Sequence, residues 1–257
     1  MIPVEIEAVL EGKTRWCVLT ADCLSPLSEM PKGSVDALVT DPPYCSGAVS
    51  ESQRTQSKGQ GLRSETLRRL GWFVGDNMGT AGLCFLLRSV AAESATVVKD
   101  TGSMVFFCDW RMQSSLQPAI ESAGLRYQGL IVWDKQSMGL GRGFRAQHEL
   151  ALHFTNGAPE YHNLGTPNIL RCPRVTVDER IHQTQKPVDL LRQIVEVVAP
   201  VGGVDLDTFA GSGSTGVACV KSARRFIGFE LSEEHAKNAR TRLREAEAES
   251  GLFAGAQ

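Results

Sequence analysis

The stretch DLDTFAGSGSTGVA, residues 205–218, carries the pattern that decides the fold. A short apolar strand leads into Gly211, Gly213 and Gly216, which have GxGxxG spacing, and a helical pattern follows them. Glycines at these positions let the backbone turn tightly and approach a ligand closely. No Lys-Ser or Lys-Thr pair follows, so this is not a phosphate loop of the Walker type. The motif alone also fits a turn that only packs a helix on a strand.

Two acids flank this turn. Asp207 lies just before the glycines, where it suits a ligand with a cationic end. Glu230 ends the next predicted strand, where it can accept hydrogen bonds from ribose hydroxyls. S-adenosylmethionine has an α-amino group, a sulfonium and a ribose, and it lacks the pyrophosphate that a helix N-terminus would bind. From the residues alone, NAD, FAD and other adenosine-bearing ligands stay open.

Predicted strands and helices alternate along the chain. Strands are predicted at 14–20, 35–40, 103–108, 130–134, 149–155, 204–207 and 225–230, and helices at 81–98, 187–199, 214–223 and 231–249. This pattern predicts an α/β fold with a mostly parallel sheet, covered by helices on both faces. Two strands between 130 and 155 have no helix between them, which predicts an antiparallel pair at a sheet edge. Ligands bind beyond the carboxyl ends of parallel strands, where Asp41, Asp207 and Glu230 all lie.

A second unusual stretch, DPPY at 41–44, follows the strand at 35–40. Pro42 and Pro43 have no N–H group, and an ionised Asp41 has no donor either, so this segment can mainly accept hydrogen bonds. Tyr44 offers a flat ring for stacking. The exocyclic amine of a nucleobase fits both features. Hydrogen bonds from its protons to Asp41 and to a backbone carbonyl would localise its lone pair for attack on a methyl sulfonium.

The bulk properties describe a globular chain. The 257 residues, 42% hydrophobic and 22% charged, fit one domain. Seven scattered cysteines form no CxxC pair, which favours a reducing compartment and argues against a disulfide framework or a metal site. The N-terminal segment has no signal-peptide pattern, and no apolar run could span a bilayer. We therefore expect a cytoplasmic protein with no membrane partner.

Basic residues gather in two stretches, although the net charge is −2. Residues 51–72 carry five basic side chains against two acidic ones, and residues 135–147 contain no acid. This distribution favours a polyanion bound on one face, while a merely solvated surface is the alternative. The predicted contacts are Arg54, Lys58, Arg63, Arg68, Arg69, Lys135, Arg142 and Arg145.

Together, DPPY and FAGSG resemble the motifs of the amino-directed DNA methyltransferases. Their order resembles the permuted β group, in which the catalytic half precedes the cofactor half. HQTQKPVDLL at 182–191 is similar to the segment that leads into the cofactor helix of that family, and 133–157 resembles a stretch of phage and prophage modification methylases. The resemblance covers about residues 14–245. It implies a Rossmann-like, S-adenosylmethionine-dependent methyltransferase fold.

The resemblance also implies roles for particular residues. Asp41, Pro42, Pro43 and Tyr44 would hold a flipped base. The cofactor would contact Asp22, Lys186, Asp207, Phe209, Ala210, Gly211, Ser212, Gly213 and Glu230, with Lys186 beside its methionine end and Asp22 near its adenine. Residues 1–257 would form a single domain with a catalytic half at about 14–156, a basic loop at about 46–79, a short recognition region at about 157–181 and a cofactor half at about 182–249.

The implied reaction is site-specific methylation of the N6 amine of an adenine extruded from duplex DNA, as in restriction-modification systems. Aspartate at the head of the motif favours adenine, because the cytosine-N4 members of the family more often have serine there. Methylation of cytosine N4, of RNA adenine or of a protein amide is the alternative within the class. A nicotinamide-dependent oxidoreductase using the glycine turn, and a non-catalytic DNA-binding protein, are alternatives from other classes. A homodimer is compatible with the sequence, which identifies no partner nuclease.

Overall fold

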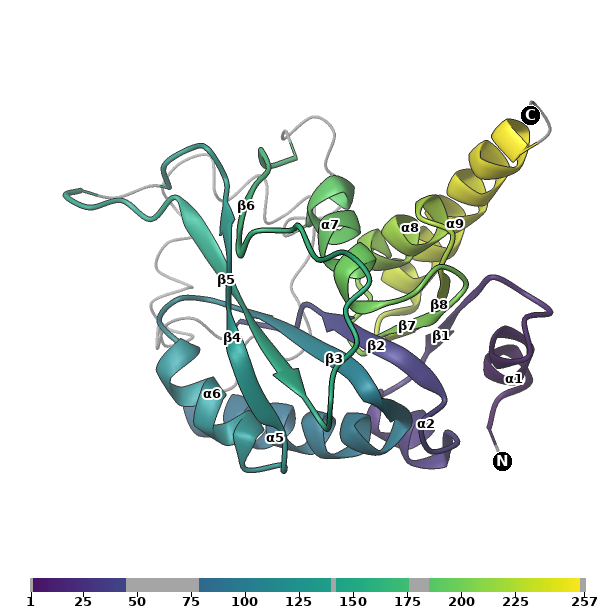
Figure 1. Ribbon diagram of the computed structural model, residues 1–257, viewed down its shortest axis with the longest axis horizontal. Helices are drawn as coiled ribbons and strands as arrows, with labels where there is room; N and C mark the ends of the chain where they lie inside the picture. The colour runs from purple at the N-terminus through teal and green to yellow at the C-terminus, as the bar shows by residue number, and fades with distance from the viewer. Residues whose placement is uncertain (1, 45–78, 140–141, 176–184, 255–257) are drawn as a thin grey trace.

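The computed structural model of the chain describes residues 2–44, 79–139, 142–175 and 185–254 (Figure 1). The strands in these ranges form one eight-stranded sheet with the order β1-β8-β7-β2-β3-β5-β4-β6. The strands are β1 (Trp16–Thr20), β2 (Val35–Thr40), β3 (Val98–Cys108), β4 (Arg126–Asp134), β5 (His148–Thr155), β6 (Ile169–Arg171), β7 (Val204–Asp207) and β8 (Arg225–Glu230).

Helices cover both faces of this sheet, as the alternating pattern predicts (Figure 1). One core joins the sheet to α1 (Val4–Leu10), α2 (Leu24–Glu29), α5 (Thr80–Val97) and α6 (Gln113–Glu121). The other core joins the opposite face to α7 (Val188–Val198), α8 (Ser214–Lys221) and α9 (Glu233–Ala254). Within the described ranges, no helix has both the length and the hydrophobicity that a membrane span requires.

The sheet is mostly parallel, which confirms the predicted fold class, and β5 is its antiparallel strand. β5 pairs with β4, as predicted, but it also pairs with β3 and therefore lies inside the sheet. The predicted position of the antiparallel pair at the edge is thus wrong. The edge strand beyond β4 is β6. With three residues, it is too short to show a recognisable alternation of apolar and polar side chains in the sequence. Between two neighbours, β5 has both rows of backbone groups paired, which suits its largely buried side chains.

The two motifs, which are far apart in the permuted sequence, lie on adjacent strands of the sheet. β2, which leads into Asp41, lies beside β7, which leads into the glycine turn, and the two strands are parallel. Their register pairs Ala37 with Asp205 and Leu38 with Leu206. Because parallel neighbours end at the same rim, the two motifs meet although most of the chain separates them.

The third glycine of the motif has a packing role. A Cβ atom on Gly216 would lie 2.6 Å from Cδ1 of Phe226 and 2.9 Å from Cδ2 of Leu243. The absent side chain therefore lets α8 approach β8 and α9 closely, which is the packing function of the last glycine in such turns.

Asp205 is a buried acid in the middle of β7. Its side chain is fully buried, and neither carboxyl oxygen has a hydrogen-bond partner among the described residues. Burial, together with the nearby Asp207, raises the pKa of Asp205 well above its ordinary value. A carboxyl group with a raised pKa in the folded state destabilises that state as the pH rises above the unfolded pKa of about 4.

We expect Asp205→Asn to stabilise the protein at alkaline pH. The isosteric amide carries no charge, so at pH 8 the variant should exceed the parent by about 1–3 kcal/mol in free energy of unfolding. Near pH 4, where the parent carboxyl is also neutral, the difference should largely disappear. Urea unfolding at the two pH values measures both quantities. A difference of equal size at both would show that the charge of Asp205 is not the cause.

Candidate active site

The carboxyl rim of the sheet brings the two sequence motifs into direct contact. Thr40, the last residue of β2, donates a hydrogen bond from Oγ1 to Oδ1 of Asp207 at 2.8 Å. Its Oγ1 also lies 3.0 Å from Oγ1 of Thr208. All three side chains are buried. The strand that carries DPPY is therefore hydrogen-bonded to the strand that carries the glycine turn, one residue before Asp41.

The glycine turn lies between the two acids predicted from the sequence. Gly211 and Gly213 have φ angles of 51° and 78°, in the left-handed region that glycine adopts without strain. The Gly211 N–H donates to Oε2 of Glu230 at 2.9 Å, and the Phe209 N–H donates to Oδ1 of Asp207 at 3.0 Å. The backbone of the turn is thus fixed to a carboxylate on each side.

A third contact holds the turn from α9. Nη1 of Arg242 donates to the carbonyl of Ser212 at 2.6 Å and to the hydroxyls of Ser212 and Ser214, each at 3.1 Å. The Ala210 N–H donates to the carbonyl of Phe229 at 2.8 Å. The hydroxyl of Ser212, predicted to line the cofactor, is therefore directed to Arg242. Sequence patterns did not indicate Arg242, because it is one of several basic side chains along α9, and only the folded structure shows that it meets the turn.

The two acids of the turn differ in protonation. Burial raises the pKa of Asp207 to about 6, against the opposing effect of hydrogen bonds from Thr215, Phe209 and Thr40. Burial also acts on Glu230, but hydrogen bonds from His235, Ser232 and Gly211 outweigh it and lower the pKa of Glu230 below its ordinary value. At neutral pH Glu230 is therefore ionised. Asp207 takes up a proton at a higher pH than Glu230 does, as the pH falls toward about 6.

Asp22 lies at the same rim. It follows β1, the neighbour of β8, and the adjoining Ala21 N–H donates to the carbonyl of Glu230 at 3.0 Å. Oδ1 of Asp22 accepts a hydrogen bond from the Leu24 N–H at 3.1 Å. The exposed carboxylate thus lies next to the strand end that carries Glu230. Among the described residues, no group of three His, Cys, Asp or Glu side chains could hold a metal ion.

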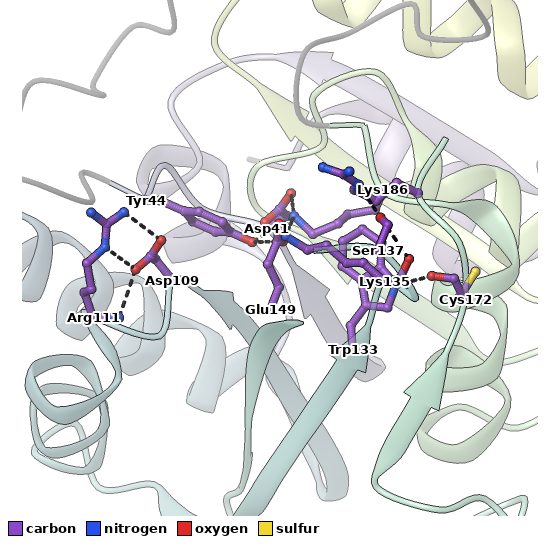
Figure 2. Close-up of polar contacts among 11 residues, drawn as sticks. Asp41, Tyr44, Asp109, Arg111, Trp133, Lys135, Ser137, Glu149, Cys172 and Lys186 are labelled. Carbon is purple, nitrogen blue, oxygen red and sulfur yellow. Dashed lines mark hydrogen bonds and ion pairs between the residues drawn. The ribbon is translucent and has the colours of Figure 1, made fainter. Parts of the chain in front are cut away.

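The DPPY loop is held by a network of charged groups (Figure 2). Nζ of Lys186 donates to Oδ2 of Asp41 at 2.6 Å and to Oη of Tyr44 at 2.8 Å. Tyr44 in turn donates to Oε2 of Glu149 at 2.9 Å. Lys186 is 5% exposed and comes from the segment before α7. The structure therefore places Lys186 against Asp41 and Tyr44 of the DPPY loop.

Glu149 is the centre of this network and was not predicted. It begins the apolar run of β5, and it lies 2.7 Å from Nζ of Lys135 and 3.2 Å from Nζ of Lys186. Burial raises its pKa, but these two ammonium groups outweigh that effect and bring the pKa of Glu149 to about 2. The available signal was an acidic residue at the start of an apolar strand. Its partners, which only the folded structure shows, indicate its role.

The residues predicted to contact DNA are distributed differently. Arg54, Lys58, Arg63, Arg68 and Arg69 lie outside the described residues. Lys135 is engaged with Glu149 inside the site, and its Nζ lies 5.4 Å from the centre of the Trp133 ring. Arg142 and Arg145 are exposed in the connection between β4 and β5, which projects from the body of the molecule (Figure 1). Nε of Arg145 donates to the carbonyl of Gly139 at 2.7 Å.

These features define a Rossmann-like methyltransferase fold. Helices cover a mostly parallel sheet, and its carboxyl rim carries a glycine turn between two acids and the acceptor-rich Asp-Pro-Pro-Tyr loop. The chain belongs to the family described as DNA methylase, whose profile matches residues 35–241.

Individual relatives agree with this assignment. The DNA adenine methyltransferase YhdJ of Escherichia coli (strain K12) is 28% identical over 268 residues, covering 91% of this chain and 83% of the relative. The crystal structure of an M1.HpyAVI-SAM complex is similar with a TM-score of 0.62 and 24% identity, covering 89% of this chain and 99% of that one. The cytosine-N4-specific PvuII DNA methyltransferase has a TM-score of 0.69 at 14% identity, with 92% and 93% coverage. The two structures establish the fold.

Proposed function

We propose that this protein transfers a methyl group from S-adenosylmethionine to the N6 amine of an adenine in duplex DNA, at a specific sequence. The proposal rests on the environment of one atom, Oδ1 of Asp41. This buried oxygen has no hydrogen-bond partner among the described residues, while Oδ2 of the same carboxylate is bound to Lys186. A buried acceptor without a partner is costly, and an amine donor from a substrate would satisfy it.

The residues around the glycine turn fit S-adenosylmethionine. When bound, this molecule supplies a methyl group on a sulfonium, which is open to attack by a nitrogen lone pair. Asp207, when ionised, suits the cationic amino group, and the ionised Glu230 suits the ribose hydroxyls. Asp22 would lie toward the adenine. The backbone of 209–213 would line the site, and its acids make it unsuited to a pyrophosphate.

Asp41 and Tyr44 would act on the target base. An exocyclic amine is a weak nucleophile, because its lone pair is delocalised into the ring. A hydrogen bond from one amine proton to Asp41 and another to a backbone carbonyl of the Pro42–Pro43 segment would localise the lone pair and stabilise the positive charge that develops. The ring of Tyr44 would stack on the base. The base must leave the duplex, because a stacked N6 amine cannot reach a buried carboxylate.

Recognition of DNA would be shared by several segments of the chain. Within one domain, the catalytic half at about 14–156 would hold the base, and the cofactor half at about 182–249 would hold S-adenosylmethionine. The exposed Arg142 and Arg145 would contact phosphates, together with the basic loop at 46–79 and the recognition region at 157–181. Aspartate at position 41 and the likeness to YhdJ favour adenine over cytosine.

The experiment that tests this proposal is mass spectrometry of nucleosides. Methyl-free duplex DNA is incubated with the purified protein and S-adenosylmethionine, digested, and analysed for methylated bases. We expect N6-methyladenine in the complete reaction and none when the cofactor is omitted. Detection of N4-methylcytosine in place of N6-methyladenine would show that cytosine N4, and not adenine N6, is the target. Methylation of RNA and not of DNA, or binding of a nicotinamide cofactor in place of S-adenosylmethionine, would overturn the proposal.

A further inference from the structure

Lys186 uses its whole hydrogen-bonding capacity on acceptors in and next to the DPPY loop. An ammonium group has three protons to donate, and Nζ of Lys186 has three acceptors within reach. They are Oδ2 of Asp41 at 2.6 Å, Oη of Tyr44 at 2.8 Å and Oε2 of Glu149 at 3.2 Å. Nζ also lies 4.9 Å and 5.0 Å from the ring centres of Tyr44 and Phe107. The side chain is therefore committed to the base site, with no proton left for the methionine end of a cofactor.

We propose that Lys186 is a positioning residue that keeps Asp41 ionised and aims its second oxygen at the amine of the target base, while Glu149 opposes this effect. The inference rests on the proposed function, because there Asp41 must accept a hydrogen bond from the base amine. It differs from the role beside the cofactor that the family resemblance implies for Lys186.

The physical reason is the cost of a buried negative charge. Burial raises the pKa of Asp41 even with Lys186 in contact, and the negative charge of Glu149 raises it further. Without the ammonium, the carboxyl would take up a proton. It would then lack the negative charge that stabilises the developing cation, and its protonated oxygen would donate where the amine needs an acceptor. The titratable groups that interact with Asp41 come from several elements. They are Lys186 before α7, Glu149 on β5, Tyr44 on its own loop, Cys108 on β3 and Asp207 on β7, and Lys135, just after β4, acts through Glu149. Among these described groups, Lys186 supplies the positive charge next to Asp41.

The test is the pH dependence of kcat for Lys186→Met, measured with saturating S-adenosylmethionine and DNA. Removing the ammonium should move the acidic limb of the profile up by about 1–3 pH units. On the acidic side of the parent limb, this corresponds to a loss of about 10- to 1000-fold, which should diminish as the pH is raised. Lys186→Arg keeps the cation and should keep the limb near its parent position.

Glu149→Gln provides a test of opposite sign. Removing the negative charge lowers the pKa of Asp41, so the acidic limb should move to lower pH. A role in packing alone would reduce kcat for both variants at every pH and would not shift their limbs in opposite directions. Opposite shifts therefore identify the charge as the cause.

Two controls separate this effect from others. Lys99 also forms a lysine–aspartate pair, at 2.6 Å from Asp36, at the opposite end of β2, and Lys99→Met should leave the pH profile unchanged. The pKa of Asp207 is about 6, so this acid also takes up a proton as the pH falls. Its protonation should weaken cofactor binding, which is why the cofactor is held saturating and its affinity is measured at each pH.

A second readout does not depend on catalysis. In protein with ¹³C-labelled aspartate carboxyls, the resonance of Asp41 is identified by its absence in Asp41→Asn, and it should titrate about 1–3 pH units higher in Lys186→Met than in the parent. An unchanged titration, or an unchanged kcat limb in an active enzyme, would overturn the role of Lys186. A parent protein that methylates no base would overturn the proposed function, and the carboxyl titration would still decide the effect of Lys186 on Asp41.

Discussion

Asp41→Ala is expected to lower the rate of methyl transfer by about 10³-fold while S-adenosylmethionine still binds with nearly its parent affinity. In the proposed mechanism the carboxylate would stabilise the positive charge that develops on the amine, and a preorganised group of this kind acts mainly in the transition state. The hydrogen bond that joins this strand end to Asp207 comes from Thr40, so Asp41→Ala leaves it in place. Single-turnover methylation and calorimetric titration of the cofactor measure the two quantities.

The same substitution removes the closest partner of Lys186 and leaves Glu149 as its remaining acidic partner, and loss of one partner of a buried ion pair costs up to about 3–5 kcal/mol. The control is therefore the double variant Asp41→Ala with Lys186→Met, which removes both members of the pair. Thermal unfolding shows whether each variant is folded at the assay temperature. A folded variant that retains most of the parent turnover would contradict the role of Asp41.

Gly213→Ala is expected to lower the free energy of unfolding by about 2–5 kcal/mol and to weaken cofactor binding strongly. Two costs add at this position. Its φ of 78° is unfavourable for alanine, and the new Cβ would lie 2.8 Å from Cβ and 3.1 Å from Cα of Ala239 on α9. Since Arg242 of the same helix holds Ser212, a shift of α9 would displace the whole turn. Urea unfolding and cofactor titration measure the effects.

Gly202→Ala is the matched control. Its φ of 76° is nearly the same, but in the part of the chain that the structure describes, no atom beyond the two neighbouring residues lies within 4 Å of the new Cβ. This variant should show the cost of the left-handed backbone alone, about 1–2 kcal/mol, with unchanged cofactor binding. Equal losses of stability in the two variants would mean that the contact with α9 adds nothing.

Secondary structure follows closely from local sequence where an apolar run ends in distinctive turn residues. The predicted strands at 35–40, 204–207 and 225–230 have the bounds of β2, β7 and β8. Short elements such as α1, α2 and β6 were not predicted, because they are stabilised by packing and by strand pairing more than by their own periodicity. The place of β5 between β3 and β4 also depends on pairing between distant segments.

The residues at the rim also fall into those that local sequence marks and those that it does not. The residue types of DPPY and of the glycine turn are local, so their position at strand ends could be read directly from the chain. The roles of Thr40, Glu149 and Arg242 depend on partners far away in sequence, and no local pattern marks them. Lys135 was assigned to a DNA surface from its neighbours in sequence, whereas its partner in space is Glu149.

The sequence by itself determined that an acid-rich rim would carry a glycine turn and an acceptor-rich loop, because parallel strands that lead into these motifs must end at one edge of the sheet. Tertiary structure decided which charges meet there. Lys186 and Asp41 lie 145 positions apart in the chain, and Tyr44 and Glu149 lie 105 apart. Whether such groups are ionised depends on burial and on distances of a few ångströms, which arise only when the strands of the sheet are assembled.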